Sequence, residues 1–183
     1  MRVLIDACVL YPTVLREIVL GVASRGGFEP FWSPRILEEW ARAAGRIEPG
    51  AQAVARGEIA LLRSAWPQAQ VTPPPDIEAA LDLPDPADTH VLAAAIAARA
   101  AVILTFNLRD FPRRALDPQG LRAQHPDAFL MALWLERPEI VTQAVVEVRN
   151  RTEDISGRAQ PLRPLLKRAK LPRLGKALQS AES

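Results

Sequence analysis

The sequence is poor in the residues that many catalytic and binding sites require. It has a single cysteine, Cys8, among 183 residues, which excludes an intramolecular disulfide and a zinc site built from cysteines. The two histidines, His90 and His125, form no Ser-His-Asp or Cys-His pattern, and no glycine-rich phosphate loop is present. Cys8 lies beside a predicted buried strand, so we interpret it as a small core residue in a reduced, cytoplasmic setting.

Long hydrophobic runs are also missing. The longest apolar stretch, Val91 to Phe106, contains Arg99 and is too short to span a bilayer. The N-terminal run MRVLIDACVL is interrupted by Asp6, which argues against a signal peptide. We therefore expect a soluble, cytoplasmic protein with no membrane partner.

Lysine is absent from residues 1–157, and charge is unevenly distributed along the chain. That segment holds 16 basic and 20 acidic side chains, a balance of −4, whereas residues 158–176 hold seven basic side chains and no acid. A basic tail on an acidic body suggests a polyanionic partner, although a solvated helix face is the plain alternative.

Strands that alternate with helices predict an α/β fold. Apolar segments predict strands at 2–5, 28–32 and 102–106, with short strands possible at 69–71 and 120–123. The predicted helices cover 13–24, 34–45, 52–66, 126–135, 138–151 and 161–181, the last broken near Pro172. Ser33 and Pro34 mark a helix start, and Gly45 marks the predicted end of that helix. This order predicts a three-layer α/β/α sandwich with a mostly parallel sheet, plus C-terminal helices.

Two aspartates follow predicted strands and should meet at one edge of the sheet. Asp6 ends the first strand, and Asp110 follows the strand at 102–106 across a tight turn. A carboxylate beside the core needs a cation or hydrogen-bond donors. Asp6 is therefore a candidate site acid, with a loop-capping role as the alternative. For Asp110 the alternative is an ordinary turn.

The adjacent Glu38 and Glu39 cannot both face a site from one helix. With about 100° per residue, Glu38 falls opposite the apolar stripe and Glu39 falls at its flank. We therefore take Glu39 as the site acid and Glu38 as a surface charge.

The sequence DPAD begins an alanine-rich helix and resembles a capping box, with Asp85 as N-cap and Asp88 at the third position. Asp88 also lies in line with the buried stripe of that helix, which favours a site role, whereas Asp85 favours capping. Thr105 and Asn107 can support Asp110 or touch a water on a metal. His90 lies off the stripe, and we predict it at the surface.

Several carboxylates without histidine or cysteine partners are hard oxygen ligands, which suit Mg²⁺ or Mn²⁺. One or two such ions would make a centre for phosphodiester hydrolysis. On these residues the sequence predicts Asp6, Glu39, Asp88 and Asp110 as catalytic and metal-binding, with Thr105, Asn107 and Asp85 in support.

Four segments together resemble the PIN-domain ribonucleases, of the kind found as VapC-like toxins of bacterial toxin–antitoxin pairs. The segments are VLIDACVL, SPRILEEW, DPADTHVLAAAIA and ILTFNLRDF, and AQHPDAFL resembles a subgroup with an added C-terminal helical region. The resemblance covers residues 1–118, so residues 119–183 are predicted as a helical extension with a basic tail.

The resemblance implies Mg²⁺- or Mn²⁺-dependent cleavage of RNA, frequent homodimers and inhibition by a small cognate antitoxin protein. It assigns the metal ligands to the same four acids, although the doubled Glu38-Glu39 and the extra Asp85 depart from the family pattern. A non-catalytic PIN-like module that binds RNA or protein through the basic tail is the alternative. A receiver domain that accepts a phosphoryl group is disfavoured, since no suitable lysine lies near the last strand.

Overall fold

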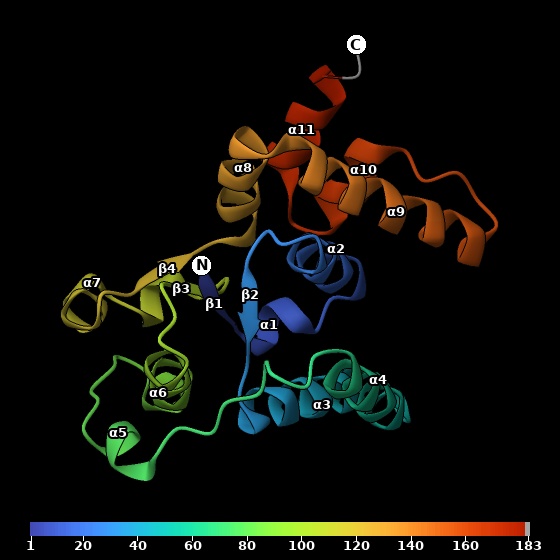
Figure 1. Cartoon of the computed structure of the whole chain (residues 1–183). Coiled ribbons are helices and arrows are strands. Elements are labelled where there is room, and N and C mark those ends of the chain that lie inside the picture. The colour runs from blue at the N-terminus through green and yellow to red at the C-terminus, as the bar shows by residue number, and fades with distance from the viewer. Residues whose placement is uncertain (182–183) are drawn as a thin grey trace. The chain divides into compact units, whose positions relative to one another are not determined.

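The chain packs into two compact units. The computed structural model describes residues 1–181. One unit comprises Met1–Tyr11 and Glu29–Gln124, and the other comprises Pro12–Phe28 and the chain from His125 onward. Figure 1 labels the helices and strands of both units.

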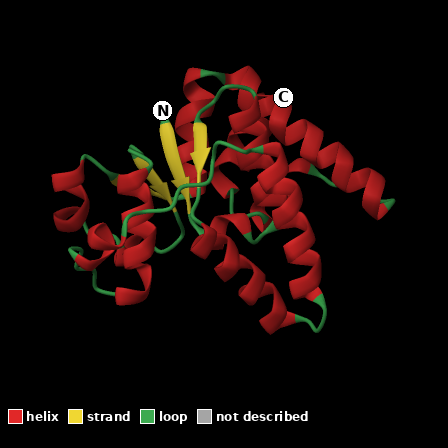
Figure 2. Cartoon of the chain, turned by 60° about the horizontal axis from the view of Figure 1, so that its bottom comes forward, coloured by secondary structure: helices red, strands yellow, loops and turns green. Residues whose placement is uncertain are grey.

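A parallel sheet of four strands forms the centre of the first unit. The strands are β1 (Arg2–Ile5), β2 (Glu29–Phe31), β3 (Val102–Leu104) and β4 (Arg122–Gln124). Their order in the sheet is β2-β1-β3-β4, and every neighbouring pair is parallel. Figure 2 shows the strands in yellow running side by side. The predicted α/β/α fold with a parallel sheet and added C-terminal helices is confirmed.

The two central strands are uninterrupted apolar runs because both faces of the sheet are covered. Residues 3–5 of β1 and 102–104 of β3 are fully buried, as expected for a parallel sheet. The register pairs Ile5 with Leu104. Asp6 and Thr105, the next residue of each strand, therefore leave the sheet side by side at its carboxyl edge.

Helices and 3-10 turns connect these strands. They are α1 (Ala7–Leu10), α3 (Pro34–Ile47), α4 (Ala51–Ala65), α5 (Pro75–Ala79), η1 (Pro86–Asp88), α6 (Thr89–Ala97), η2 (Leu108–Asp110), α7 (Arg113–Leu116) and η3 (Asp117–Gln119). Helix α3 begins as predicted, with the Ser33 hydroxyl accepting a hydrogen bond from the Ile36 amide at 3.2 Å. The segment at 69–71 contributes only an isolated bridge between Gln70 and Trp32.

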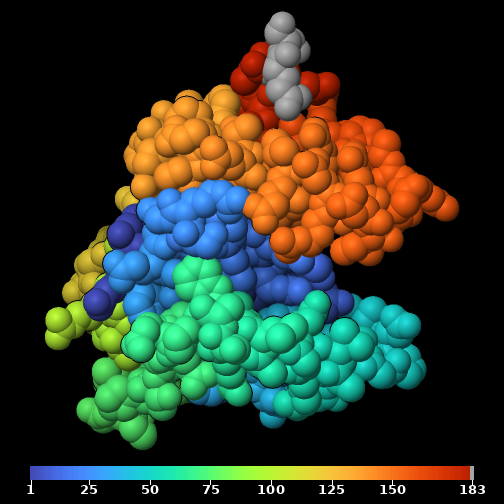
Figure 3. Space-filling model, turned by 45° about the vertical axis from the view of Figure 1, so that its right-hand side comes forward, coloured from blue at the N-terminus to red at the C-terminus, as the bar shows by residue number. Residues whose placement is uncertain are grey.

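The predicted end of α3 at Gly45 is wrong, because the helix continues to Ile47. Helices α3 and α4 lie side by side, and a Cβ on Gly45 would stand 3.1 Å from Cβ of Gln52. Gly45 therefore permits close packing of the two helices, whose outer surface is continuous in Figure 3. The turn between them uses Gly50, which has a left-handed φ of +87°.

As far as residue 181, the second unit consists of helices and the turns that connect them. Its helices are α2 (Thr13–Ser24), α8 (Pro126–Glu136), α9 (Pro138–Ser156), α10 (Leu162–Arg168) and α11 (Pro172–Ala181). The rings of Phe28 and Phe129 meet edge to face, with centroids 5.2 Å apart. The Arg137 guanidinium donates to the backbone oxygens of Gly26 and Gly27, which ties the end of α8 to the turn after α2.

The predicted domain division at residue 118 stays a prediction, since compact packing units are not the same as independently folding domains. No helix within residues 1–181 combines the length and apolar character that crossing a membrane requires.

Candidate active site

Asp6 is a nearly buried carboxylate at the end of β1, with 5% of its surface exposed. Its backbone belongs to local structure: the amide donates to the Leu104 oxygen at 3.1 Å, and the Asp6 oxygen accepts from the amides of Val9 and Leu10. The side chain, however, does not cap helix α1. It is directed instead to two side-chain donors.

Thr105 is the first of these donors. Its fully buried hydroxyl donates to Oδ2 of Asp6 at 2.7 Å and accepts from the Asn107 amide at 3.0 Å. The sequence interpretation had Thr105 and Asn107 supporting Asp110. In the structure Thr105 supports Asp6, and Asn107 contributes through its backbone N–H.

Cys8 is the second donor, and sequence reasoning did not connect it with the site. Its Sγ lies 3.2 Å from Oδ2 of Asp6 and accepts from the Phe106 amide at 3.4 Å. Burial, followed by the charge of Asp6, raises the pKa of the Cys8 thiol to about 12. The thiol is therefore protonated at neutral pH and acts as a hydrogen-bond donor. Its position two residues after Asp6 was the available signal.

The carboxyl of Asp88 has a pKa that burial and the neighbouring acids raise. Burial, followed by the charges of Asp6, Asp110 and Asp85, raises the pKa of this half-buried carboxyl to about 6, while His90 acts in the opposite direction. Like charges disfavour ionisation when no cation lies between them. The negative charges of Asp6, Asp110 and Asp85 therefore all act on the Asp88 carboxyl.

Asp85 and Asp110 belong to two different 3-10 turns, Asp85 as the N-cap of η1 and Asp110 as the last residue of η2. The carboxylate of Asp85 accepts from the Ala87 amide at 2.9 Å, so its predicted capping role is confirmed. Asp110 is the last residue of η2 and is partly exposed. Its backbone amide donates to the Asn107 oxygen at 3.1 Å, which holds the tight turn that the sequence predicted.

Glu39 and Glu38 face different surroundings. Oε1 of Glu39 lies 2.8 Å from Nε2 of His90 and 4.0 Å from Nε of Arg35. Glu38 pairs with Arg56 and Arg42, and the hydrogen bond from Arg56 holds the pKa of Glu38 below its ordinary value. The two side chains are about equally exposed, at 34% for Glu38 and 37% for Glu39, so the assignment of Glu39 as the site acid stays a prediction.

The prediction that His90 lies at the surface is wrong, since only 2% of it is exposed. Every residue of α6 from Thr89 to Ala95 is buried, so this helix has no solvent face from which an off-stripe residue could emerge. The His90–Glu39 contact meets the distance of an ion pair but not the geometry of a hydrogen bond, and both ring nitrogens are buried. His90 therefore links α6 to the Glu39 carboxylate of α3.

The donor set fits a hard divalent cation, because carboxylate and hydroxyl oxygens are what such ions prefer. Burial, followed by the charges of Asp6, Asp110 and Asp85, raises the pKa of Asp88, and a bound cation would oppose this shift. As the side chains stand, no three His, Cys, Asp or Glu residues within 1–181 come together closely enough to hold an ion. The acids would have to draw together when an ion binds.

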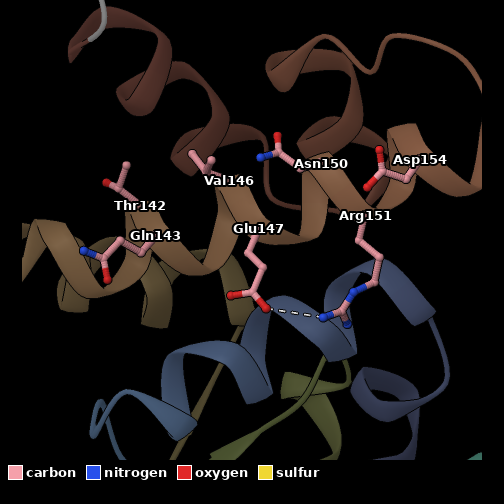
Figure 4. A pocket seen from close by; sticks show the side chains of 7 residues that line it. All are labelled: Thr142, Gln143, Val146, Glu147, Asn150, Arg151 and Asp154. Atoms are coloured by element: carbon pink, nitrogen blue, oxygen red, sulfur yellow. Dashed lines mark hydrogen bonds and ion pairs between the residues drawn. The ribbon is translucent and has the colours of Figure 1, made fainter.

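Two cavities have linings that include none of these acids. One, of about 460 Å³, is bordered by η2, α7 and β4 and includes Phe111, Arg113 and Arg122. The other, of about 540 Å³, follows one face of α9. Figure 4 shows the side chains that line it and the ion pair between Arg151 and Glu147, in which Nη2 and Oε1 are 3.3 Å apart. No predicted site residue lines either cavity.

Comparison with known proteins gives two findings. A family model described as a PIN domain matches residues 2–109. A protein of Mycobacterium tuberculosis, named "Putative ribonuclease VapC50", is 51% identical over 59 residues, which cover 32% of this chain and 34% of that protein. The aligned stretch thus spans about a third of the relative's length. No solved structure matches the chain significantly.

Proposed function

The chain belongs to the PIN-domain family, and on that premise we propose that it is an endoribonuclease that hydrolyses RNA phosphodiester bonds with Mg²⁺ or Mn²⁺. The observation that carries the proposal is the position of Asp6 at the carboxyl edge of the sheet, nearly buried and held by the Thr105 hydroxyl. Nearby, burial first and then the charges of Asp6, Asp110 and Asp85 raise the pKa of Asp88 to about 6. The ribonuclease name of the partly matching relative supports the same substrate class.

In this proposal each residue of the site has a distinct task. Asp6, Glu39, Asp88 and Asp110 would hold the metal, and Thr105 and Cys8 keep the Asp6 carboxylate oriented by donating to Oδ2. Asn107 holds the Thr105 hydroxyl in place through its amide. When bound, divalent ions supply the Lewis acidity that activates water and stabilises the leaving oxygen.

The proposal is tested by cleavage of a fluorescent single-stranded RNA. We expect cleavage with Mg²⁺ or Mn²⁺, loss of cleavage with EDTA, and a loss of at least about 100-fold in Asp6→Asn, because a neutral amide is a far weaker ligand. Glu38→Gln is the matched control, since Glu38 pairs with arginines on the helix surface. Cleavage by Asp6→Asn at the rate of the unaltered protein would refute the proposal.

We further propose that the ribonuclease is the toxin of a toxin–antitoxin pair in the cytoplasm and that it acts as a homodimer. These roles rest on the family alone. Expression should arrest growth, and co-expression of a small neighbouring reading frame should restore it; Asp6→Asn should be harmless in the same assay. Growth arrest that persists in Asp6→Asn would separate toxicity from nuclease activity. Analytical ultracentrifugation measures the oligomeric state.

A further inference from the structure

Helices α10 and α11 form an amphipathic pair whose inner side is built from leucines. Leu165, Leu166, Leu171, Leu174 and Leu178 are all buried, with at most 3% exposed. The helices can cross closely because Gly175 faces Leu166, where an added Cβ would stand 3.1 Å from the leucine Cβ. The apolar side of this pair is therefore used in packing.

The N-terminus of α11 is fixed by a buried carboxylate. Oδ2 and Oδ1 of Asp127 accept from the backbone amides of Arg173 and Leu174, both at 3.0 Å, and Asp127 is only 4% exposed. This acid therefore satisfies backbone donors and does not neutralise the basic side chains. Helix α11 is thus held on α8 through backbone hydrogen bonds, and its basic side chains do not take part in them.

All charged side chains between residues 158 and 181, the segment that contains this pair, are basic and exposed. Seven basic residues lie in 158–176, and all seven are exposed; we call them the basic face, and they are Arg158, Arg163, Lys167, Arg168, Lys170, Arg173 and Lys176. The segment 158–181 contains no acidic residue. Lys170 apart, none of these side chains forms an ion pair with another residue in 1–181.

We propose that the basic face binds the phosphate backbone of single-stranded RNA. This inference depends on the proposed function only in taking RNA as the ligand. The rest of the chain up to residue 157 has a net charge of −4 and carries the acid cluster, which repels RNA. The exposed cations in and next to this helical pair supply the attraction that the body lacks, because each neutralised phosphate releases counterions.

The composition of the face also indicates how RNA is bound. Residues 158–181 contain no aromatic side chain on which a base could stack. Lysine and arginine contacts to phosphate position a strand without distinguishing its sequence. We therefore expect affinity at this surface to be independent of base identity, so that any cleavage specificity arises elsewhere.

The test compares two variants of equal net charge. The first replaces Arg163, Lys167, Arg173 and Lys176 with glutamine, which preserves helix propensity. The matched control replaces four exposed arginines of the first unit with glutamine: Arg46, Arg63, Arg99 and Arg122. Circular dichroism and thermal unfolding verify that both variants fold.

Binding of fluorescent U, A and C oligomers is measured in EDTA, so that no cleavage occurs. For the first variant we expect affinity to fall at least about ten-fold for all oligomers, and the slope of log K against log salt to become shallower by up to about 0.7 per lost contact. The control should bind almost as the unaltered protein does.

Equal loss in both variants would show that net charge alone matters and would overturn the proposal. Unchanged RNA binding by the first variant would also overturn the proposal. If that variant kept RNA binding but lost binding to poly-glutamate, the basic face would be a surface that docks an acidic protein. Binding and cleavage are measured separately, so a protein that binds through this face but does not cleave would refute only the nuclease.

Discussion

The Thr105 hydroxyl donates to Oδ2 of Asp6 at 2.7 Å although the two residues are 99 positions apart in the sequence. The parallel register of Ile5 with Leu104 brings them together, since each is the next residue of its strand. Thr105 is fully buried, so no water replaces its hydroxyl. The orientation of the central carboxylate therefore depends on the pairing of β1 and β3.

Replacing Thr105 with valine should lower kcat for RNA cleavage by about ten-fold or more. Valine keeps the shape but removes the donor, and a loss of about 1.4 kcal/mol in transition-state stabilisation corresponds to ten-fold. Single-turnover cleavage at saturating Mg²⁺ measures the effect. Thr105→Ser keeps the hydroxyl and should retain most activity; equal activity of the serine and valine variants would contradict a role for the hydrogen bond.

Replacing His90 with phenylalanine should raise the Mg²⁺ concentration needed for half-maximal cleavage by about ten-fold, with a smaller effect in His90→Gln. The imidazole Nε2 lies 2.8 Å from Oε1 of Glu39, and phenylalanine fills the buried site without a polar atom to hold that carboxylate. A Mg²⁺ titration of activity measures the change, with urea denaturation as the check on folding. A shift in stability with no shift in Mg²⁺ dependence would make His90 a packing residue only.

The metal-free protein should lose stability as pH rises through 6. Burial and neighbouring acids raise the pKa of Asp88 from 3.8 to about 6, so between these values the folded state holds more protons than the unfolded state. The contribution of Asp88 is therefore most favourable below about pH 4 and is lost as pH rises through about 6.

Asp88→Asn tests this dependence. The variant should be more stable than the metal-free protein at pH 7.5 by on the order of 1 kcal/mol, after allowing for solvent screening of a half-buried group. The gain should shrink at pH 4.5 and should disappear when Mg²⁺ stabilises the unaltered protein. Thermal unfolding in EDTA measures it; a gain that is the same at both pH values would count against charge repulsion at Asp88.

Replacing Asp127 with alanine should lower the free energy of unfolding by about 1–2 kcal/mol, because two amides at the start of α11 lose their acceptor. Hydrogen exchange should accelerate at the amides of Arg173 and Leu174, which donate hydrogen bonds to the Asp127 carboxylate in the unaltered protein. Asp127→Asn can still accept one of these bonds and should lose less stability. Unchanged exchange at both amides in the alanine variant would show that other contacts hold the helix.

The sequence by itself determined the order of strands and helices, since apolar runs and helical periodicity are local properties. It also determined that Asp6 and Asp110 follow strands, which indicated their common edge, and that Ser33 begins α3. Because the rotation per residue of a helix is fixed, the sequence also indicated that Glu38 and Glu39 point in different directions, and they meet different partners.

Only the tertiary structure decided which partners these residues meet. Because of the register of β1 and β3, the Thr105 hydroxyl donates its hydrogen bond to Asp6 and not to Asp110. His90 was expected at the surface, but residues 89–95 of α6 are all buried and His90 contacts Glu39. Gly45 lies inside α3, where it permits the close approach of Gln52 in α4. Each outcome depends on contacts between segments distant in sequence, which local patterns do not encode.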